Sequence, residues 1–245
     1  MVEAKGIWYL YDGFEFVLKD LTFSVPDGQI VGVLGANGAG KTTLLKILAG
    51  LLPSKEMKHE PVRVLIDGKP VQENYGEIAF VSEAGSWFRD LTPQQFGAFL
   101  ADFYPHFDMA YYEKLLKFFE LEEKPVKTMS KGQKSRVEVA AGVAKRTKYL
   151  IMDEPFLGKD MFTRQDFMQL LAGSLTGEET IFITTHEINE IENFIDRALI
   201  LQNGKLAADI MLDTLRESGH SLTEKMKEVM GYRKDGFTEF LRTGE

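Results

Sequence analysis

The chain has 245 residues, 44% hydrophobic and 27% charged, which is the composition of a globular protein and excludes a disordered or low-complexity chain. Its formal net charge of −8 argues against nucleic acid as a partner, because that affinity rests on a basic surface. The chain has no cysteine, which excludes disulfides, thiolate metal sites and a cysteine nucleophile.

Strand and helix patterns alternate along the first part of the chain. Residues 1–30 and 62–70 have the pattern of antiparallel strands beside a main sheet. The apolar spacing over Lys41–Leu51 predicts a helix, which Gly50 and Pro53 would end. Compact apolar runs predict strands buried on both faces, as in a parallel sheet. These runs are Ile30–Leu34, Ile78–Val81, Tyr149–Met152 and Thr180–Thr184.

The second half of the chain combines helices with one hairpin. Residues 92–146 are predicted to be mostly helical, with Asp108 capping a helix through Phe119 and Ser130 capping another through Lys145. The Asn203-Gly204 pair suits the tight turn of a hairpin between Leu199–Gln202 and Lys205–Ala208. Two amphipathic helices, broken near Gly219 and Gly231, are expected in the last 35 residues.

These patterns predict an α/β fold with a mainly parallel core sheet, an antiparallel β subdomain and a helical subdomain at about residues 84–146. We expect the main domain to span residues 1–210 and a C-terminal helical extension to span 211–245. No apolar run approaches the roughly 18 residues that cross a bilayer, and the first residues lack a signal-peptide pattern. A cytoplasmic protein is therefore expected.

Residues 35–42, Gly-Ala-Asn-Gly-Ala-Gly-Lys-Thr, match the phosphate-loop pattern G-x-x-x-x-G-K-[ST] between a predicted strand and a predicted helix. Glycines let backbone N–H groups turn inward around phosphate oxygens, and the helix N-terminus adds positive potential. Lys41 is expected to reach the β- and γ-phosphates, and the Thr42 hydroxyl to ligate Mg²⁺. The predicted ATP-binding residues here are Gly35, Ala36, Asn37, Gly38, Ala39, Gly40, Lys41, Thr42 and Thr43.

Two acids, Asp153 and Glu154, follow the predicted strand Tyr149–Met152. In open α/β sheets, ligands bind at the carboxyl ends of the strands, where the phosphate loop also lies. We expect Asp153 to orient Mg²⁺, directly or through a water, and Glu154 to polarise the attacking water as a general base.

With the segment Met129-Ser130-Lys131-Gly132-Gln133, these motifs resemble the ATP-binding cassette (ABC) family of nucleotide-binding domains, a branch of the P-loop NTPases. The segment is similar to the family signature LSGGQ and stands at the expected place. By this resemblance Ser130, Lys131, Gly132 and Gln133 contact ATP. Lys131 departs from the family glycine, and it either leans toward the partner's nucleotide or points into water.

Further positions match the family with some departures. His186 resembles the switch histidine that contacts the γ-phosphate, and Asp160 occupies the D-loop position. Tyr11 is the best candidate to stack on adenine, with Tyr9, Phe14 and Phe16 as competitors. Glu83 replaces the usual Q-loop glutamine, and it either contacts Mg²⁺ or is a solvated loop acid. The predicted catalytic residues are Glu154, His186 and Lys41, and the predicted metal ligands are Thr42, Asp153 and Glu83.

The resemblance implies an ATPase subunit that dimerises head-to-tail around two ATP–Mg²⁺, with a second copy of itself or a homologous subunit. It would drive a separate transmembrane permease from the inner face of the cell membrane. Trp87, Phe88 and Arg89 are candidates for an exposed anchor on that permease, or else for the core of the helical subdomain. Residues 103–108 and the Ser-Lys-Gly signature resemble a bacterial exporter subgroup for antimicrobial or amphipathic peptides.

Other functions remain as alternatives. A soluble ABC ATPase acting in translation or DNA repair usually carries two cassettes or a coiled-coil insertion, and this chain has neither. An ATP-dependent dimerisation module would not need Glu154 and His186. A P-loop kinase would have no use for the segment Met129–Gln133.

Overall fold

The computed structural model describes residues 1–11, 15–53, 63–82, 84–155, 168–173, 176–185 and 188–231. Its main sheet has six strands in the order β10-β9-β3-β8-β7-β6, and all neighbouring pairs are parallel except β10 with β9. The strands are β3 Ile30–Gly35, β6 Ile78–Val81, β7 Tyr149–Met152, β8 Thr180–Thr184, β9 Arg197–Gln202 and β10 Lys205–Met211.

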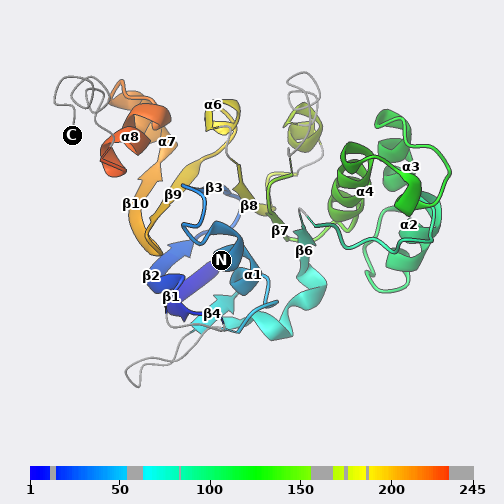
Figure 1. The fold of residues 1–245 in the computed structure, drawn as a ribbon, viewed down its shortest axis with the longest axis horizontal. Helices are drawn as coiled ribbons and strands as arrows, with labels where there is room; N and C mark the ends of the chain where they lie inside the picture. Colours follow the sequence, from blue (N-terminus) through cyan, green and yellow to red (C-terminus); the bar gives the residue numbers. More distant parts are fainter. Residues whose placement is uncertain are drawn as a thin grey trace, which may run out of the picture.

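A second sheet is antiparallel and has the order β2-β1-β4-β5. Its strands are β1 Val2–Tyr9, β2 Leu18–Val25, β4 Arg63–Ile66 and β5 Lys69–Pro70. Together the two sheets confirm the predicted α/β class, with a mainly parallel core and an antiparallel β part beside it (Figure 1).

Most of the described helices lie in three places around the main sheet (Figure 1). Helix α1 follows β3, helices α2 to α4 gather beyond the β6 edge of the main sheet, and α7 and α8 lie at the end of β10. The α-helices whose whole extent lies within the described residues are α1 Lys41–Leu48, α2 Pro93–Ala101, α3 Met109–Phe118, α4 Lys131–Ala144, α6 Ile188–Ile191, α7 Leu212–Glu217 and α8 Leu222–Val229. Short 3₁₀ turns are Val71–Glu73, Tyr75–Glu77 and Val126–Thr128.

The parallel strands of the main sheet are buried on both faces, as predicted, whereas the antiparallel edge strand β10 is partly exposed. On one face, Val31, Ile151 and Phe182 pack in the same apolar cluster as α1 and the antiparallel sheet. On the other face, Leu150 and Ile183 pack in the cluster that contains α2, α3, α4, α7 and α8. The described C-terminal helices therefore share a core with the main sheet, while the predicted boundary at residue 210 stays a prediction.

Several predicted strands and helices have the bounds that the structure shows, but β9 and β10 extend beyond the predicted hairpin strands Leu199–Gln202 and Lys205–Ala208. Asp108 caps α3 by accepting from the Tyr111 N–H, and Ser130 caps α4 in a reciprocal capping box with Gln133. The hairpin turn at Asn203 and Gly204 has positive φ at both residues, as a type I′ turn requires. Within the described residues, no helix combines the length and apolar character needed to cross a membrane.

Helix α1 ends at Leu48 with Ala49 as its C-cap, just before Gly50, the residue that the sequence predicted would end it. Gly50 adopts a φ of +71°, its N–H bonds to the Ile47 carbonyl, and the Leu51 N–H bonds to the Lys46 carbonyl. These two hydrogen bonds form a Schellman motif, which ends a helix at a glycine in the left-handed conformation. The apolar spacing continues past that glycine although the helix does not.

Candidate nucleotide site

The phosphate loop connects β3 to α1 and relies on glycine at two tight positions. Gly35 has a φ of +149°, and a Cβ there would lie 2.4 Å from the Leu201 carbonyl oxygen. Gly40 has a φ of +101° and caps α1 without a side-chain hydrogen bond. A Cβ at Gly40 would lie 2.5 Å from Leu18 Cδ2. The first-turn N–H groups of α1 thus have no side-chain cap at this position, which suits an anion.

Lys41 turns back into this loop. Its Nζ donates to the Gly35 carbonyl at 2.9 Å and to the Ala36 carbonyl at 3.2 Å, and the residue is only 6% exposed. Burial lowers the pKa of Lys41, while the charges of Glu154 and Asp153 act in the opposite direction. The loop therefore holds its cation where the predicted phosphates would lie.

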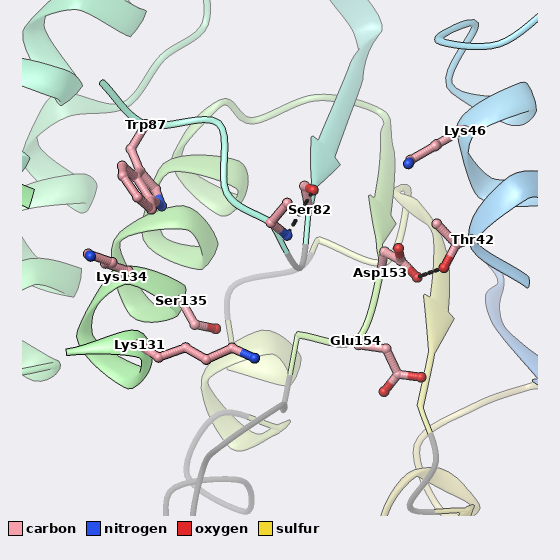
Figure 2. A pocket seen from close by; sticks show the side chains of 10 residues that line it. Thr42, Lys46, Ser82, Trp87, Lys131, Lys134, Ser135, Asp153 and Glu154 are labelled. Carbon is pink, nitrogen blue, oxygen red and sulfur yellow. Dashed lines mark hydrogen bonds between the residues drawn. The ribbon is translucent and has the colours of Figure 1, made fainter. Parts of the chain in front are cut away.

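The strand-end carboxylates are joined to the loop through Thr42. The Thr42 hydroxyl donates to Asp153 Oδ1 at 3.0 Å, and Asp153 is 4% exposed (Figure 2). The hydroxyl of Thr184 donates to the same oxygen at 2.9 Å. Two hydroxyls on one carboxylate oxygen hold Asp153 at the end of β7, beside the start of α1.

Glu154 has an unusual backbone conformation for a residue with a side chain. Its φ is +49°, and its N–H donates to Thr184 Oγ1 at 2.9 Å. Non-glycine residues in the left-handed region carry strain and are common at functional sites. The Thr184 hydroxyl thus holds both acids, because it accepts from Glu154 while donating to Asp153.

A cavity of about 410 Å³ lies between these groups and α4 (Figure 2). Thr42, Asp153 and Glu154 line one side, and Trp87 lines the wall near α4. Lys131 extends from the first turn of α4 toward the strand end that carries the two acids. The full lining is Thr42, Lys46, Ser82, Ala84, Trp87, Lys131, Lys134, Ser135, Asp153 and Glu154.

The predicted signature residues begin α4. Ser130 Oγ accepts from the Gln133 N–H at 3.2 Å, and the Gln133 side chain accepts from the Ser130 N–H at 3.0 Å. Lys131 lines the cavity of its own chain, an arrangement that neither of its two sequence interpretations includes. Contact of Ser130, Lys131, Gly132 and Gln133 with ATP stays a prediction.

Other predicted site residues have different outcomes. The Tyr11 hydroxyl lies 3.2 Å from Thr43 Oγ1, so Tyr11 stands beside the first turn of α1 and is 49% exposed there. Its stacking on adenine stays a prediction. Glu83, Asp160 and His186 lie outside the described residues, as does the competitor Phe14.

The described residues fit ATP with Mg²⁺. Mg²⁺ prefers oxygen ligands and is usually held by one or two protein groups together with phosphates. The Thr42 hydroxyl and the Asp153 carboxylate are such oxygens, and they lie 3.0 Å apart beside the phosphate loop. A Cβ at Gly38 would meet nothing within 4 Å, so the tip of the loop is open to a ligand.

Sequence reasoning missed several residues of the site, among them Lys46 and Thr184; the cavity-lining residues Ser82, Ala84, Lys134 and Ser135 were also not predicted. Lys46 lies one helical turn after Thr42 on α1, so its place in the cavity follows from the i, i+4 spacing. Thr184 was noted only as a neighbour of His186. Its contact with Asp153 depends on the pairing of β7 with β8, in which Met152 lies opposite Ile183.

Comparisons with known proteins agree with this geometry. The family profile described as "ABC transporter" matches residues 18–157. The ABC transporter ATP-binding protein YtrB of Bacillus subtilis is 29% identical over 222 residues, which cover 89% of this chain and 74% of YtrB. The cobalt import ATP-binding protein CbiO of Rhodobacter capsulatus is 28% identical over 225 residues, covering 85% of this chain and 78% of CbiO. A solved ATP-binding subunit of an ABC transporter superposes with a TM-score of 0.81 at 27% identity, covering 94% of this chain and 99% of that one.

Proposed function

Because the chain belongs to the ABC transporter family as an ATP-binding and ATP-hydrolysing subunit, we propose that it pairs head-to-tail with a second such subunit and drives a separate membrane permease. One observation carries the ATPase part of this proposal. The Thr42 hydroxyl of the phosphate loop and the Asp153 carboxylate are hydrogen-bonded at 3.0 Å, with Glu154 next in sequence. The phosphate-binding and carboxylate motifs therefore form one site.

Each residue of this site has a proposed role in hydrolysis. Lys41 and the loop N–H groups hold the phosphates, and Thr42 and Asp153 hold Mg²⁺, which when bound neutralises phosphate charge. Glu154 orients the attacking water and accepts its proton. The Thr184 hydroxyl positions both acids, because it donates to the carboxylate of Asp153 and accepts from the backbone N–H of Glu154.

The head-to-tail pairing is proposed from the signature resemblance. Ser130 begins a helix of 14 residues and caps it, so its end of α4 carries the partial positive charge of a helix N-terminus. The γ-phosphate of an ATP held by the phosphate loop of the partner subunit would bind there, with Ser130, Lys131, Gly132 and Gln133 as its contacts. Asp160 and His186 are proposed to complete the site by the same resemblance.

The permease is proposed to dock on an exposed aromatic cluster of the helical part, made of Phe88, Phe99 and Phe103. These residues are 50%, 36% and 66% exposed, and their neighbouring rings lie 4.9 and 4.8 Å apart. Trp87 does not form part of this cluster, because it is half-buried against the core and its ring lies under Lys134. The chain would then sit at the inner face of the membrane through its permease.

Export is the direction we propose, from the signature variant and residues 103–108. The relative CbiO is named as a cobalt import protein, so sequence similarity alone does not distinguish export from import. A non-transport ATPase or an ATP-dependent dimerisation module would use the same nucleotide site. Transport into or out of vesicles that contain the co-purified permease separates these functions, and failure to co-purify with any membrane protein argues for the alternatives.

The Glu154→Gln variant tests the ATPase and the pairing together. Gln keeps the shape but cannot accept the proton of the water, so turnover should fall by about 10²- to 10⁴-fold. ATP binding should persist, and sedimentation should show a dimer with ATP and Mg²⁺. Glu217→Gln, an exposed acid on α7, is the matched control and should hydrolyse ATP normally. Near-normal turnover of Glu154→Gln would remove Glu154 as the base, and a persistent monomer would contradict the pairing.

A further inference from the structure

Glu138 is a buried carboxylate in α4, two turns after the start of that helix. It is 3% exposed, and burial raises its pKa while hydrogen bonds from Ser86 oppose the shift. Its oxygen Oε2 accepts from the Ser86 N–H at 2.8 Å and from the Ser86 hydroxyl at 3.0 Å. The other oxygen accepts from the Ser82 N–H at 3.4 Å.

These hydrogen bonds all reach one loop, which follows β6. The start of that loop is held from a second side, because the Asp153 N–H donates to the Val81 carbonyl at 2.9 Å. Helix α4 also packs tightly here, since a Cβ at Gly142 would lie 2.3 Å from Val81 Cγ2. The described loop residues Ser82 and Ser86 are therefore hydrogen-bonded to α4, while Val81 before them is hydrogen-bonded to Asp153.

The loop and the helix form adjoining parts of the nucleotide cavity. Ser82 and Ala84 line it from the loop, and Lys131, Lys134 and Ser135 line it from α4 (Figure 2). Burying a carboxylate carries a large desolvation penalty, because the charged group loses its hydration. Glu138 offsets part of that cost through its hydrogen bonds to Ser82 and Ser86, and the nearby charge of Lys145 also favours its charged form. Its hydrogen bonds therefore connect α4 to this loop.

We propose that Glu138 is a positioning residue that makes the loop after β6 and the signature helix α4 move as one body. The inference rests on the proposed function, because it concerns how the Asp153 end of the site and the Ser130 end stay in register during the ATP cycle. Without Glu138, α4 would still fold and pack, but the loop would no longer follow it.

The decisive variant is Glu138→Leu, because an apolar residue of similar size avoids the cost of a buried charge and keeps the packing of α4. We expect its melting temperature to stay near the wild-type value while kcat falls about tenfold, with little change in ATP affinity. Amide exchange at Ser86 should become about tenfold faster, because its N–H loses its acceptor. Glu138→Gln keeps one acceptor oxygen, so its kcat and its exchange rate at Ser86 should lie between those of the wild type and Glu138→Leu. It replaces Glu138→Leu in the test if that variant does not fold.

Two further variants complete the design. Ser86→Ala should slow turnover less than Glu138→Leu, and the double variant should be no slower than Glu138→Leu, because both remove the same connection. Tyr112→Phe is the matched control, since it removes another buried hydrogen bond of the helical part, from the Tyr112 hydroxyl to the Pro93 carbonyl at 2.9 Å. It should leave kcat unchanged.

The results separate this inference from the proposed function. Wild-type protein that fails to hydrolyse ATP would contradict the proposed function. A folded Glu138→Leu variant with kcat within twofold of wild type and unchanged exchange at Ser86 would overturn the inference and leave the ATPase intact. A Tyr112→Phe variant as slow as Glu138→Leu would also overturn it, because the effect would then be one of general stability.

Discussion

The Thr184 hydroxyl offers a sharp test of how the site is held, through the isosteric change Thr184→Val. Thr184 is fully buried, and its hydroxyl makes 2.9 Å hydrogen bonds to Asp153 Oδ1 and from the Glu154 N–H. A hydrogen bond to a charged group contributes about 1.5–3 kcal/mol, and an N–H left without an acceptor costs about 1–3 kcal/mol. Because Glu154 is only partly buried, we expect a total loss of about 3 kcal/mol of stability, at the lower end of that sum.

For a chain of this size, that loss lowers the melting temperature by about 6–12 °C. Turnover should fall further than stability alone explains, because the Asp153 carboxylate and the Glu154 backbone lose their common anchor. A displacement of about 1 Å in a catalytic group costs up to about 10²-fold, so we expect kcat to fall about 10- to 100-fold. Steady-state ATPase assays across a Mg²⁺ titration, with thermal unfolding of the same samples, measure both effects.

The control lies on the same strand. Thr180 is also fully buried, and its hydroxyl accepts from the Gly28 N–H at 3.1 Å, at the far end of β8. Thr180→Val should lose about 1 kcal/mol of stability and keep its kcat. Thr184→Ser restores the hydroxyl and should restore turnover. A kcat of Thr184→Val within twofold of wild type, or an equal loss in Thr180→Val, would refute the reasoning.

Two further predictions concern the loop and helix α3. Gly40→Ala places a Cβ 2.5 Å from Leu18 Cδ2 at a φ of +101°, so ATP affinity should fall at least about tenfold in a binding titration, while Gly68→Ala, with a φ of +75° and open space, should bind normally. Asp108→Ala removes the cap on α3 and should cost about 1 kcal/mol in chemical denaturation, whereas Asp108→Asn should keep most of it. The hydrogen bond from the Tyr111 N–H, and to a smaller extent Arg146, lowers the pKa of Asp108. The stability difference between wild type and Asp108→Ala should therefore be complete above the usual carboxyl pKa and should disappear as the pH falls through the lowered pKa.

Many of the secondary-structure elements could be predicted from local sequence patterns. Ile78–Val81 and Tyr149–Met152 were predicted with the boundaries that the structure has, because strands buried on both faces must be continuously apolar and their ends change abruptly to polar residues. Asp108 and Ser130 were predicted as caps because a cap is a contact between residues three apart. The phosphate loop has the same character, since its chemistry depends on consecutive backbone groups.

The tertiary structure decided which distant residues meet. The pairing of β7 with β8 brings Thr184 to Asp153, and the packing of α4 on β6 brings Glu138 to Ser86. Neither contact leaves a mark in the spacing of residues along the chain, because strand order and register depend on the packing of the whole core. The sequence by itself determined the elements and the chemistry of each motif, and the fold determined how the motifs are joined.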